Sequence, residues 1–236
     1  MRFKQSSLFA VAGAVCLMFA GCMVPEQVQT DRLWQQVVQV QKAVDAYFKQ
    51  NNILPYVYTE DQQKLTTKYK VNFKELKGFL GEFPSSAFAE GGYFLFVLID
   101  VEEDPTVRLF DLRVNDTVSK VQHKIKGYLE HHQALPEKTR MNEFFYTIDY
   151  KKLNMEPVEV PSPYSQEELP LIMDHQGQVY IDYRTEVMKK WQQTRQKPGE
   201  KTDLRWWLAK DSLYVPAFSP LIKMKGNEPQ LLPVQN

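Results

Sequence analysis

Cysteine is almost absent from this chain, and both copies lie near its start. The 236 residues contain only Cys16 and Cys22. Beyond residue 22 there is no thiol to form a disulfide or a covalent catalytic intermediate. The fold therefore has to be held by its hydrophobic core, and cysteine chemistry is excluded from any catalytic site beyond that residue.

Glycine and histidine are also scarce, which excludes several kinds of catalytic site. The chain has 10 glycines, none in a phosphate-cradling loop, and it lacks the nucleophile-elbow and zinc-protease motifs. Its four histidines do not have the converging spacing of a zinc site. We therefore expect no metal and no cofactor, and we interpret His131 and His132 as residues that favour a helix C-terminus. A weak metal site formed by His131 and Glu130 is the alternative.

Neither sign of charge dominates the composition. The chain has 29 basic and 29 acidic residues. If Arg2 and Lys4 are removed with a leader, 29 − 2 = 27 basic residues remain against 29 acidic ones. A nucleic-acid-binding domain carries a basic surface. We therefore expect no nucleic-acid partner.

The chain opens with a segment that has the features of an export signal. Arg2 and Lys4 precede an apolar run over residues 8–20, which Phe19-Ala20-Gly21-Cys22 closes. A positive start, an apolar core of about a dozen residues and small residues at its end are typical of a secretory signal peptide. A membrane-spanning helix needs about 20 residues, so this run is too short to be one. Residues 1–21 are predicted to be a signal peptide.

The residues that close this run resemble the lipobox of bacterial lipoproteins. The resemblance implies cleavage between Gly21 and Cys22 and a diacylglycerol on the Cys22 sulfur. More broadly, the chain resembles the small uncharacterised lipoproteins of Gram-positive bacilli. That resemblance implies a protein held by its N-terminal lipid at the extracytoplasmic face of the cell membrane, with residues 22–30 as a short tether. The alternative is a secreted protein whose cysteine falls near the cleavage site by chance.

Two stretches of the chain carry the same residues in the same order, which indicates an internal repeat. Val40-Gln41 and the following Leu54-Pro55 recur at the same spacing as Val121-Gln122 and Leu135-Pro136. A shorter third copy follows the second. We therefore divide the chain into repeat 1 (31–116), repeat 2 (117–184) and a shortened repeat 3 (185–236).

Each repeat reads as a helix, a short helix and a β-hairpin. Apolar residues three or four apart over 33–47 and 118–128 predict amphipathic helices. Asn72 and Asp149 are good N-caps for the short helices, and Glu75 would complete a capping box with Asn72. Strand-forming runs flank a turn in each repeat. The predicted fold class is α+β, built from tandem helix–short helix–β-hairpin repeats with antiparallel sheet.

Two charged pairs occupy matching positions in the first two repeats. Asp111 and Asp182 each precede an arginine by two residues, Arg113 and Arg184. A cross-strand or same-face salt bridge explains this pattern. A repeated ligand site is the alternative.

Aromatic residues gather in the third repeat around Trp206 and Trp207. Exposed rings would suit contact with a carbohydrate, a peptide or the bilayer interface. The alternative is that one tryptophan caps the core and the other packs against the terminal hairpin. The pair is the candidate contact site for a ligand or partner.

These features favour a non-enzymatic interaction or scaffold protein of the cell envelope, with an envelope protein as its partner. The first alternative is a binder of a small solute or a cell-wall ligand. The second is a cell-wall hydrolase that uses carboxylates, for which the acidic runs at 102–104 and 167–168 supply residue types without a defined separation. No catalytic residue is assigned.

Overall fold

The computed structural model of this protein describes residues 26–58 and 67–233. The predicted signal peptide and Cys22 lie outside the described residues. The chain divides into two units, Met1–Gln35 and Gln36–Asn236. The described part of the first unit is the beginning of a helix, and everything below concerns the second unit unless stated.

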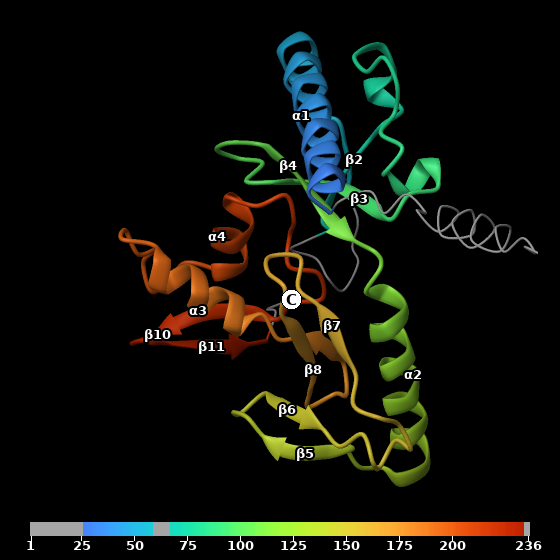
Figure 1. Cartoon of the computed structure of the whole chain (residues 1–236), viewed down its shortest axis with the longest axis vertical. Helices are drawn as coiled ribbons and strands as arrows, with labels where there is room; N and C mark the ends of the chain where they lie inside the picture. Colours follow the sequence, from blue (N-terminus) through green and yellow to red (C-terminus); the bar gives the residue numbers. More distant parts are fainter. Residues whose placement is uncertain (1–25, 59–66, 234–236) are drawn as a thin grey trace, which may run out of the picture. The chain divides into compact units, whose positions relative to one another are not determined.

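The first segment, residues 36–111, combines one helix with a four-stranded antiparallel sheet (Figure 1). Its elements are α1 (Glu26–Asn51, which begins in the first unit), β1 (Tyr56–Tyr58), β2 (Tyr69–Val71), β3 (Phe94–Ile99) and β4 (Thr106–Asp111). The strands pair in the order β1-β2-β3-β4. Two short 3-10 helices, η1 (Glu75–Gly78) and η2 (Phe88–Glu90), lie in the long connection between β2 and β3.

The second segment, residues 115–181, repeats the order of helix and antiparallel strands. Its elements are α2 (Asn115–His132), β5 (Glu137–Arg140), β6 (Phe145–Ile148), β7 (Glu159–Pro161), β8 (Glu168–Asp174) and β9 (Val179–Ile181). Strand β8 pairs with β6, β7 and β9. The predicted α+β class with antiparallel sheet is therefore confirmed.

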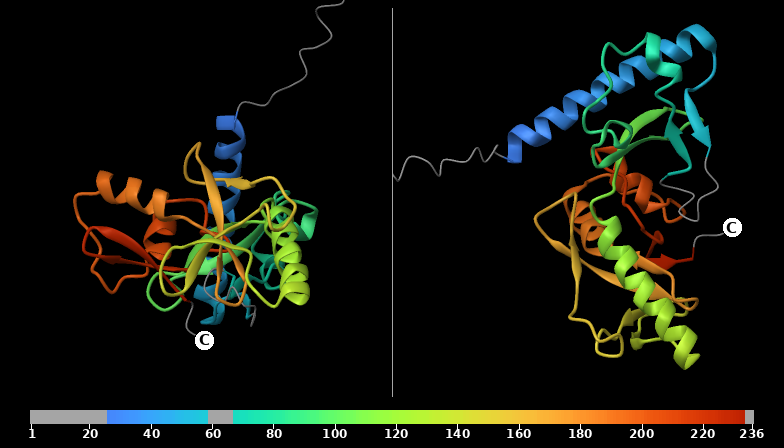
Figure 2. Two further views of the ribbon diagram at one scale, coloured as in Figure 1. Left: turned by 90° about the horizontal axis from the view of Figure 1, so that it is seen from below. Right: turned by 90° about the vertical axis from the view of Figure 1, so that its right-hand side faces the viewer.

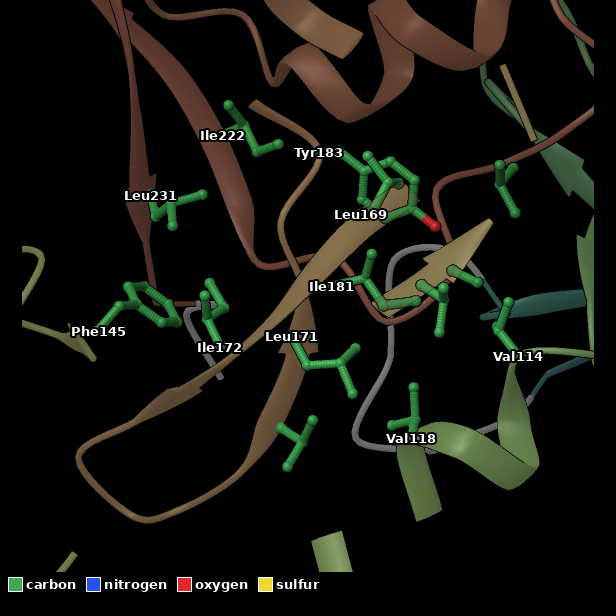
Figure 3. Packing of buried hydrophobic residues seen from close by; sticks show 14 of the residues in the cluster. Val114, Val118, Phe145, Leu169, Leu171, Ile172, Ile181, Tyr183, Ile222 and Leu231 are labelled. Carbon is green, nitrogen blue, oxygen red and sulfur yellow. The ribbon is translucent and has the colours of Figure 1, made fainter. Parts of the chain in front are cut away.

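The C-terminal part of the chain adds two helices and a hairpin. These elements are α3 (Arg184–Gln193), α4 (Leu204–Lys210), β10 (Leu221–Lys225) and β11 (Glu228–Leu232). Figure 3 shows that side chains from this hairpin meet those of α2, β8 and β9 in one cluster. The cluster includes Val118, Leu171, Ile181, Ile222 and Leu231, each at most 3% exposed. One hydrophobic core thus joins the second segment to the C-terminal elements and to strands β3 and β4 of the first segment, which contribute Val97, Ile99 and Phe110.

The apolar stripes predicted for the two long helices are the faces that the helices bury. Val40 and Val44 of α1 are fully buried, as are Val121 and Ile125 of α2. Residues at this spacing lie on one side of a helix, and burying that side against strands supplies most of the stability of such a helix. The helical assignment of both stretches is confirmed.

Of the two predicted short helices, the first is present as the 3-10 helix η1 but is not capped by Asn72, and the second is absent. In the first segment the 3-10 turn begins at Glu75 and is preceded by Lys74, whose amide donates to Asn72 Oδ1. Glu75 does not complete a capping box, because its carboxylate accepts the Tyr47 hydroxyl at 2.9 Å. In the second segment the residues after Asp149 form turns, and Asp149 Oδ1 accepts the Lys151 amide. A side chain that bonds to the backbone two residues on stabilises a turn in competition with a helix.

The two segments share specific contacts as well as element order. The Gln41 side chain donates to the Pro105 carbonyl and accepts the Val107 amide. The Gln122 side chain makes the same two bonds, to Gly177 and Val179. Each helix is thus fixed to the turn end of its hairpin by one glutamine, at the position that the sequence comparison aligned.

The Leu-Pro positions also have matching contacts. The Asn72 amide donates to the Pro55 carbonyl at 2.8 Å. The Asp149 amide donates to the Pro136 carbonyl at 2.7 Å. In both segments this bond closes the first pair of strands, β1–β2 or β5–β6, directly after the helix.

Candidate interaction surface

The two predicted aspartate–arginine pairs are ion pairs, each formed at the end of a strand. Arg113 Nη2 lies 2.6 Å from Asp111 Oδ2, and Arg184 Nη2 lies 2.7 Å from Asp182 Oδ2. In each pair the backbone amide of the arginine also donates to Oδ1 of the aspartate. These bonds turn the chain from a strand into the next helix, so the salt-bridge prediction is confirmed and the pairs have a structural role.

A third pair with the same geometry was not recognised in the sequence. Arg205 Nη2 lies 2.7 Å from Asp203 Oδ2, at the start of α4. The Arg205 side chain is only 2% exposed, whereas that of Arg113 is 51% exposed. An aspartate two residues before an arginine, at the start of a helix, is the sequence signal that would have identified this third pair.

Trp206 and Trp207 are half-buried and lie against the core. The Trp207 ring meets Trp191 edge-on, with ring centroids 6.1 Å apart. The Lys190 ammonium lies 4.8 Å from the centre of the Trp207 ring and donates to the Trp207 carbonyl. The groups around Trp207 are therefore largely other residues of the same chain. This makes the pair Trp206 and Trp207 a weaker candidate contact site than the exposed residues described below.

The histidines and acidic runs do not come together into a site. His132 stacks on Tyr128 at the end of α2, with ring centroids 4.2 Å apart. In the described part of the chain, no three His, Cys, Asp or Glu side chains are grouped so that they would hold a metal ion. Glu167 pairs with Lys189 at 3.1 Å. In the described part of the chain, the acidic turn residues 102–104 form no ion pair with another element.

Ser165, Glu186 and Lys189 form the most connected polar cluster outside the ion pairs. Ser165 Oγ donates to Glu186 Oε1 at 2.5 Å and accepts from Lys189 Nζ at 3.0 Å. A serine–lysine catalytic pair requires a neutral lysine. Lys189 instead forms ion pairs with two carboxylates, Glu167 at 3.1 Å and the buried Glu186 at 3.7 Å. The cluster compensates the buried charge of Glu186 and fixes the turn before β8 on α3.

Among the described residues, exposed large apolar side chains occur only in the first segment and at Trp34, just before it. Between residues 94 and 233, where the chain is described throughout, no large apolar side chain is exposed. Within 36–93 the exposed ones are Val38, Phe48, Ile53, Tyr56, Val57, Tyr58, Phe83, Phe88 and Tyr93. Scattered exposed apolar residues are ordinary on protein surfaces, but a one-sided distribution marks an interaction region.

The two most exposed of these residues lie on one tightly closed loop. Tyr93 is 64% exposed and Phe88 is 61% exposed. The Phe94 amide donates to Ser86 and the Gly92 amide donates to Ala87, which closes the loop between the two rings. A Cβ atom on Gly92 would lie 2.1 Å from the Ser86 carbonyl oxygen, so only glycine fits there. The backbone therefore holds both aromatic residues on a compact, closed loop.

A second exposed group lies on β1 and β2. Tyr56 and Tyr58 both meet the ring of Tyr69, with centroids 4.9 and 6.1 Å apart. The Lys68 ammonium lies 5.0 Å from the centre of the Tyr69 ring. Tyrosine, with an apolar ring and a polar tip, is a common residue of interaction surfaces. This group and the aromatic loop together form the candidate interaction surface.

A pocket of about 490 Å³ lies beside the hairpin β10–β11. Lys201, Lys223 and Lys225 line it, together with Glu143 and Glu200. None of these five side chains forms an ion pair within the described part of the chain. The pocket therefore carries one more positive than negative charge and would favour an anionic occupant.

Comparison with known proteins gives one match. Residues 34–111 match the YphF family N-terminal domain, so the similarity covers 78 of the 236 residues. No curated protein and no solved structure matched the chain. No helix in the described part is long and apolar enough to cross a membrane. The region similar to the YphF N-terminal domain ends at the last residue of β4, and it contains all of the exposed large apolar residues named above.

Proposed function

We propose that this protein is a lipid-anchored lipoprotein of the extracytoplasmic face of the cell membrane that acts as a non-enzymatic interaction protein of the cell envelope. Its partner-binding surface is the aromatic loop around Phe88 and Tyr93. The observation that carries the proposal is that every exposed large apolar side chain of the described residues lies within residues 34–93. The lipid on Cys22 is the anchor, as the lipobox-like residues imply.

The proposal includes an internal repeat whose copies have diverged. The glutamine contacts of Gln41 and Gln122 and the bonds to Pro55 and Pro136 support two copies of one helix-and-sheet unit. Repeat arrays commonly provide binding surfaces. In this chain the second copy shares its core with the C-terminal elements and with β3 and β4 of the first copy, whereas α1, β1 and the loops of the first copy keep large apolar residues exposed. We assign partner binding to these exposed residues of the first copy.

The partner surface is tested by crosslinking in living cells. The tagged full-length chain is crosslinked and the attached proteins are identified by mass spectrometry. We expect an envelope protein that is recovered with the parent chain and lost from a variant carrying Phe88→Ser and Tyr93→Ser, because both rings supply exposed apolar contact area.

A matched control separates loss of the surface from a general effect of mutation. Lys138→Ser and Glu156→Ser change two exposed residues of the second segment. This variant should retain the partner. Recovery of the same proteins from all three chains, or of none from the parent, contradicts the proposed surface.

The lipid anchor has its own test. Cys22→Ala removes the acylated sulfur, so the protein should leave the membrane fraction or accumulate as uncleaved precursor. Intact mass of the membrane-extracted parent should equal that of the chain beginning at Cys22 plus the lipid. A retained Met1, or membrane retention of a normally processed Cys22→Ala chain, would contradict acylation.

The lysine-lined pocket supports a second candidate function, the binding of an anionic solute or cell-wall ligand. Lys201, Lys223 and Lys225 have no carboxylate partner and meet at one opening. Calorimetric titration with inorganic phosphate and with anionic wall fragments tests this function. Binding that is lost on Lys223→Ala with Lys225→Ala would favour it, and an absence of heat with every fragment would count against it.

A further inference from the structure

The pocket beside the hairpin β10–β11 is built from three stretches that lie far apart in the sequence. The hairpin lies against α3 and α4 (Figure 2). The turn before β6 (142–144) and the loop before α4 (200–201) complete the lining. Asn142 Nδ2 donates to the Leu231 carbonyl at 2.9 Å, and Asn142 Oδ1 accepts the Phe144 amide at 2.8 Å. These bonds fix the turn to the hairpin, so this wall of the pocket is already in place.

Two polar side chains of the pocket lie opposite each other across the hairpin. Lys223 of β10 is paired with Gln230 of β11 in the antiparallel register, so both side chains lie on one face. Both are half-buried, and within residues 26–58 and 67–233 neither forms a hydrogen bond or an ion pair. Residues opposite each other have Cβ atoms about 4.5–5.5 Å apart. One anionic group could therefore accept hydrogen bonds from both.

The other charged residues of the pocket are exposed. Lys225 lies two residues beyond Lys223 on the same face, and it forms no ion pair with Glu228, which is opposite it in the register. Lys201 adds a third ammonium group, and Glu143 and Glu200 add two carboxylates. The small positive excess favours an anion of low charge over a polyanion.

The face that carries Lys223 is apolar at its other end. Leu232 lies two residues beyond Gln230 on the same face of β11. Phe144 of the turn also lines the pocket, and both apolar side chains are only half-buried. Contact with an apolar ligand group would remove more of their surface from water. The pocket thus offers cationic and apolar groups side by side, as small-molecule sites commonly do.

We propose that this pocket binds a small, singly charged anion that carries an apolar group. The charged group lies between Lys223 and Gln230, and the apolar group lies on Phe144 and Leu232. The volume of about 490 Å³ is within the range of about 300–1,000 Å³ that holds small molecules. The inference rests on the second candidate function, anion binding at this pocket, and adds the class of ligand.

Three probes separate the charge from the apolar group. Hexanoate has both, acetate has the charge alone, and hexanol has the apolar chain alone. Isothermal titration calorimetry uses the purified full-length chain in detergent, with titration into detergent alone as the reference. Hexanoate should bind at least about tenfold more tightly than acetate and than hexanol, because only hexanoate uses both parts of the pocket. Competition by dihexanoyl phosphatidylglycerol would identify a lipid as the source of the anion, and its absence a soluble carboxylate.

Two variants assign the parts of the ligand to residues. Lys223→Gln removes the half-buried charge, so hexanoate should lose its preference over hexanol. Leu232→Ser removes apolar contact, so the affinity for hexanoate should fall to that for acetate. Lys126→Gln changes an exposed lysine of α2 and should leave hexanoate binding unchanged. Equal circular dichroism of all the chains establishes that they fold.

Two results would overturn the inference without removing anion binding. One is equal affinity of the parent chain for acetate and hexanoate. The other is hexanoate binding that neither Lys223→Gln nor Leu232→Ser changes, which would place the ligand elsewhere. An absence of heat with every probe and with inorganic phosphate would instead remove the second candidate function itself.

Discussion

At the scale of single residues, burial decides how much each of the three aspartate–arginine pairs contributes to the free energy of unfolding. The three aspartate–arginine pairs have nearly identical geometry, but Arg205 is almost fully enclosed and Arg113 is half-exposed. An exposed ion pair is worth about 0–1 kcal/mol, because water screens it. Removing one partner of a buried pair leaves an uncompensated charge and costs about 3–5 kcal/mol. Identical motifs are therefore expected to differ in their effect on stability.

This difference can be measured with two matched substitutions. Arg205→Ala should lower the free energy of unfolding by about 3 kcal/mol or more, because it leaves a cavity where a fully buried side chain was packed and the Ser219 carbonyl loses a donor. Arg113→Ala should lower it by about 1 kcal/mol. Urea denaturation followed by circular dichroism gives both values. Equal losses would show that burial does not determine the contribution of the pair.

Two glycines of the first segment provide a second comparison at this scale. A Cβ atom at Gly92 would overlap the Ser86 backbone, whereas a Cβ atom at Gly81 meets nothing within 4 Å. Gly92→Ala should therefore open the aromatic loop, and Gly81→Ala should leave it intact. Protease cleavage within residues 86–93 provides the measurement, with faster cleavage expected for Gly92→Ala alone. Unchanged cleavage would mean that the loop is not closed by this contact.

At the scale of elements, one hydrogen-bonding side chain connects each long helix to its hairpin. Gln122 donates to Gly177 and accepts from Val179, and Gln41 does the same at Pro105 and Val107. These bonds satisfy backbone groups at the start of β4 and β9 that would otherwise need water or another strand. The helix and the hairpin of each segment are therefore expected to unfold together.

This coupling is testable by amide hydrogen exchange. Gln122→Ala removes the acceptor of the Val179 amide, so that amide should exchange much faster while the rest of the core remains protected. The loss of stability should be about 1–2 kcal/mol, typical of a buried group left without a partner. Gln41→Ala should have the same local effect at Val107. Protection of Val179 that does not change in Gln122→Ala would contradict the coupling.

At the scale of the whole molecule, buried tyrosines make stability depend on alkaline pH. Burial raises the pKa of Tyr150 to about 12. Burial also raises the pKa of Tyr164, Tyr180 and Tyr183 well above the ordinary value of 10.0. The fold thus favours the neutral phenol at each of these positions, and ionisation opposes folding.

The sign of the pH dependence follows from these raised pKa values. Below pH 10 the tyrosines are neutral in both states and their contribution to stability is complete. As the pH rises from 10 toward 12, the unfolded chain releases its protons first, so the free energy of unfolding falls. Part of the tyrosinate absorbance should appear only together with the loss of circular dichroism, in a cooperative alkaline transition. Complete ionisation of all the tyrosines without loss of structure would contradict the burial of these four side chains.

Local spacing in the sequence was sufficient for the two long helices, the main hairpins and the first two ion pairs. Those features depend on residues a few positions apart, such as the apolar stripe of α1 or Asp111 with Arg113. The cap predicted at Asn72 and the short helix predicted at Asp149 were wrong because a turn and a helix start with the same capping residues. Asp203 with Arg205 was missed although it has the same spacing as the first two pairs.

The location of the candidate surface was decided only by tertiary structure. Phe88 and Ile181 are both large and apolar, and nothing in their neighbouring residues distinguishes the exposed one from the buried one. Burial depends on which elements pack together, and the C-terminal hairpin closes the core of the second segment from residues far along the chain. The sequence by itself determined the α+β class and the long helices, since periodicity and capping act locally. Which apolar residues remain exposed depends on packing between distant segments, because only that packing removes side chains and backbone groups from water.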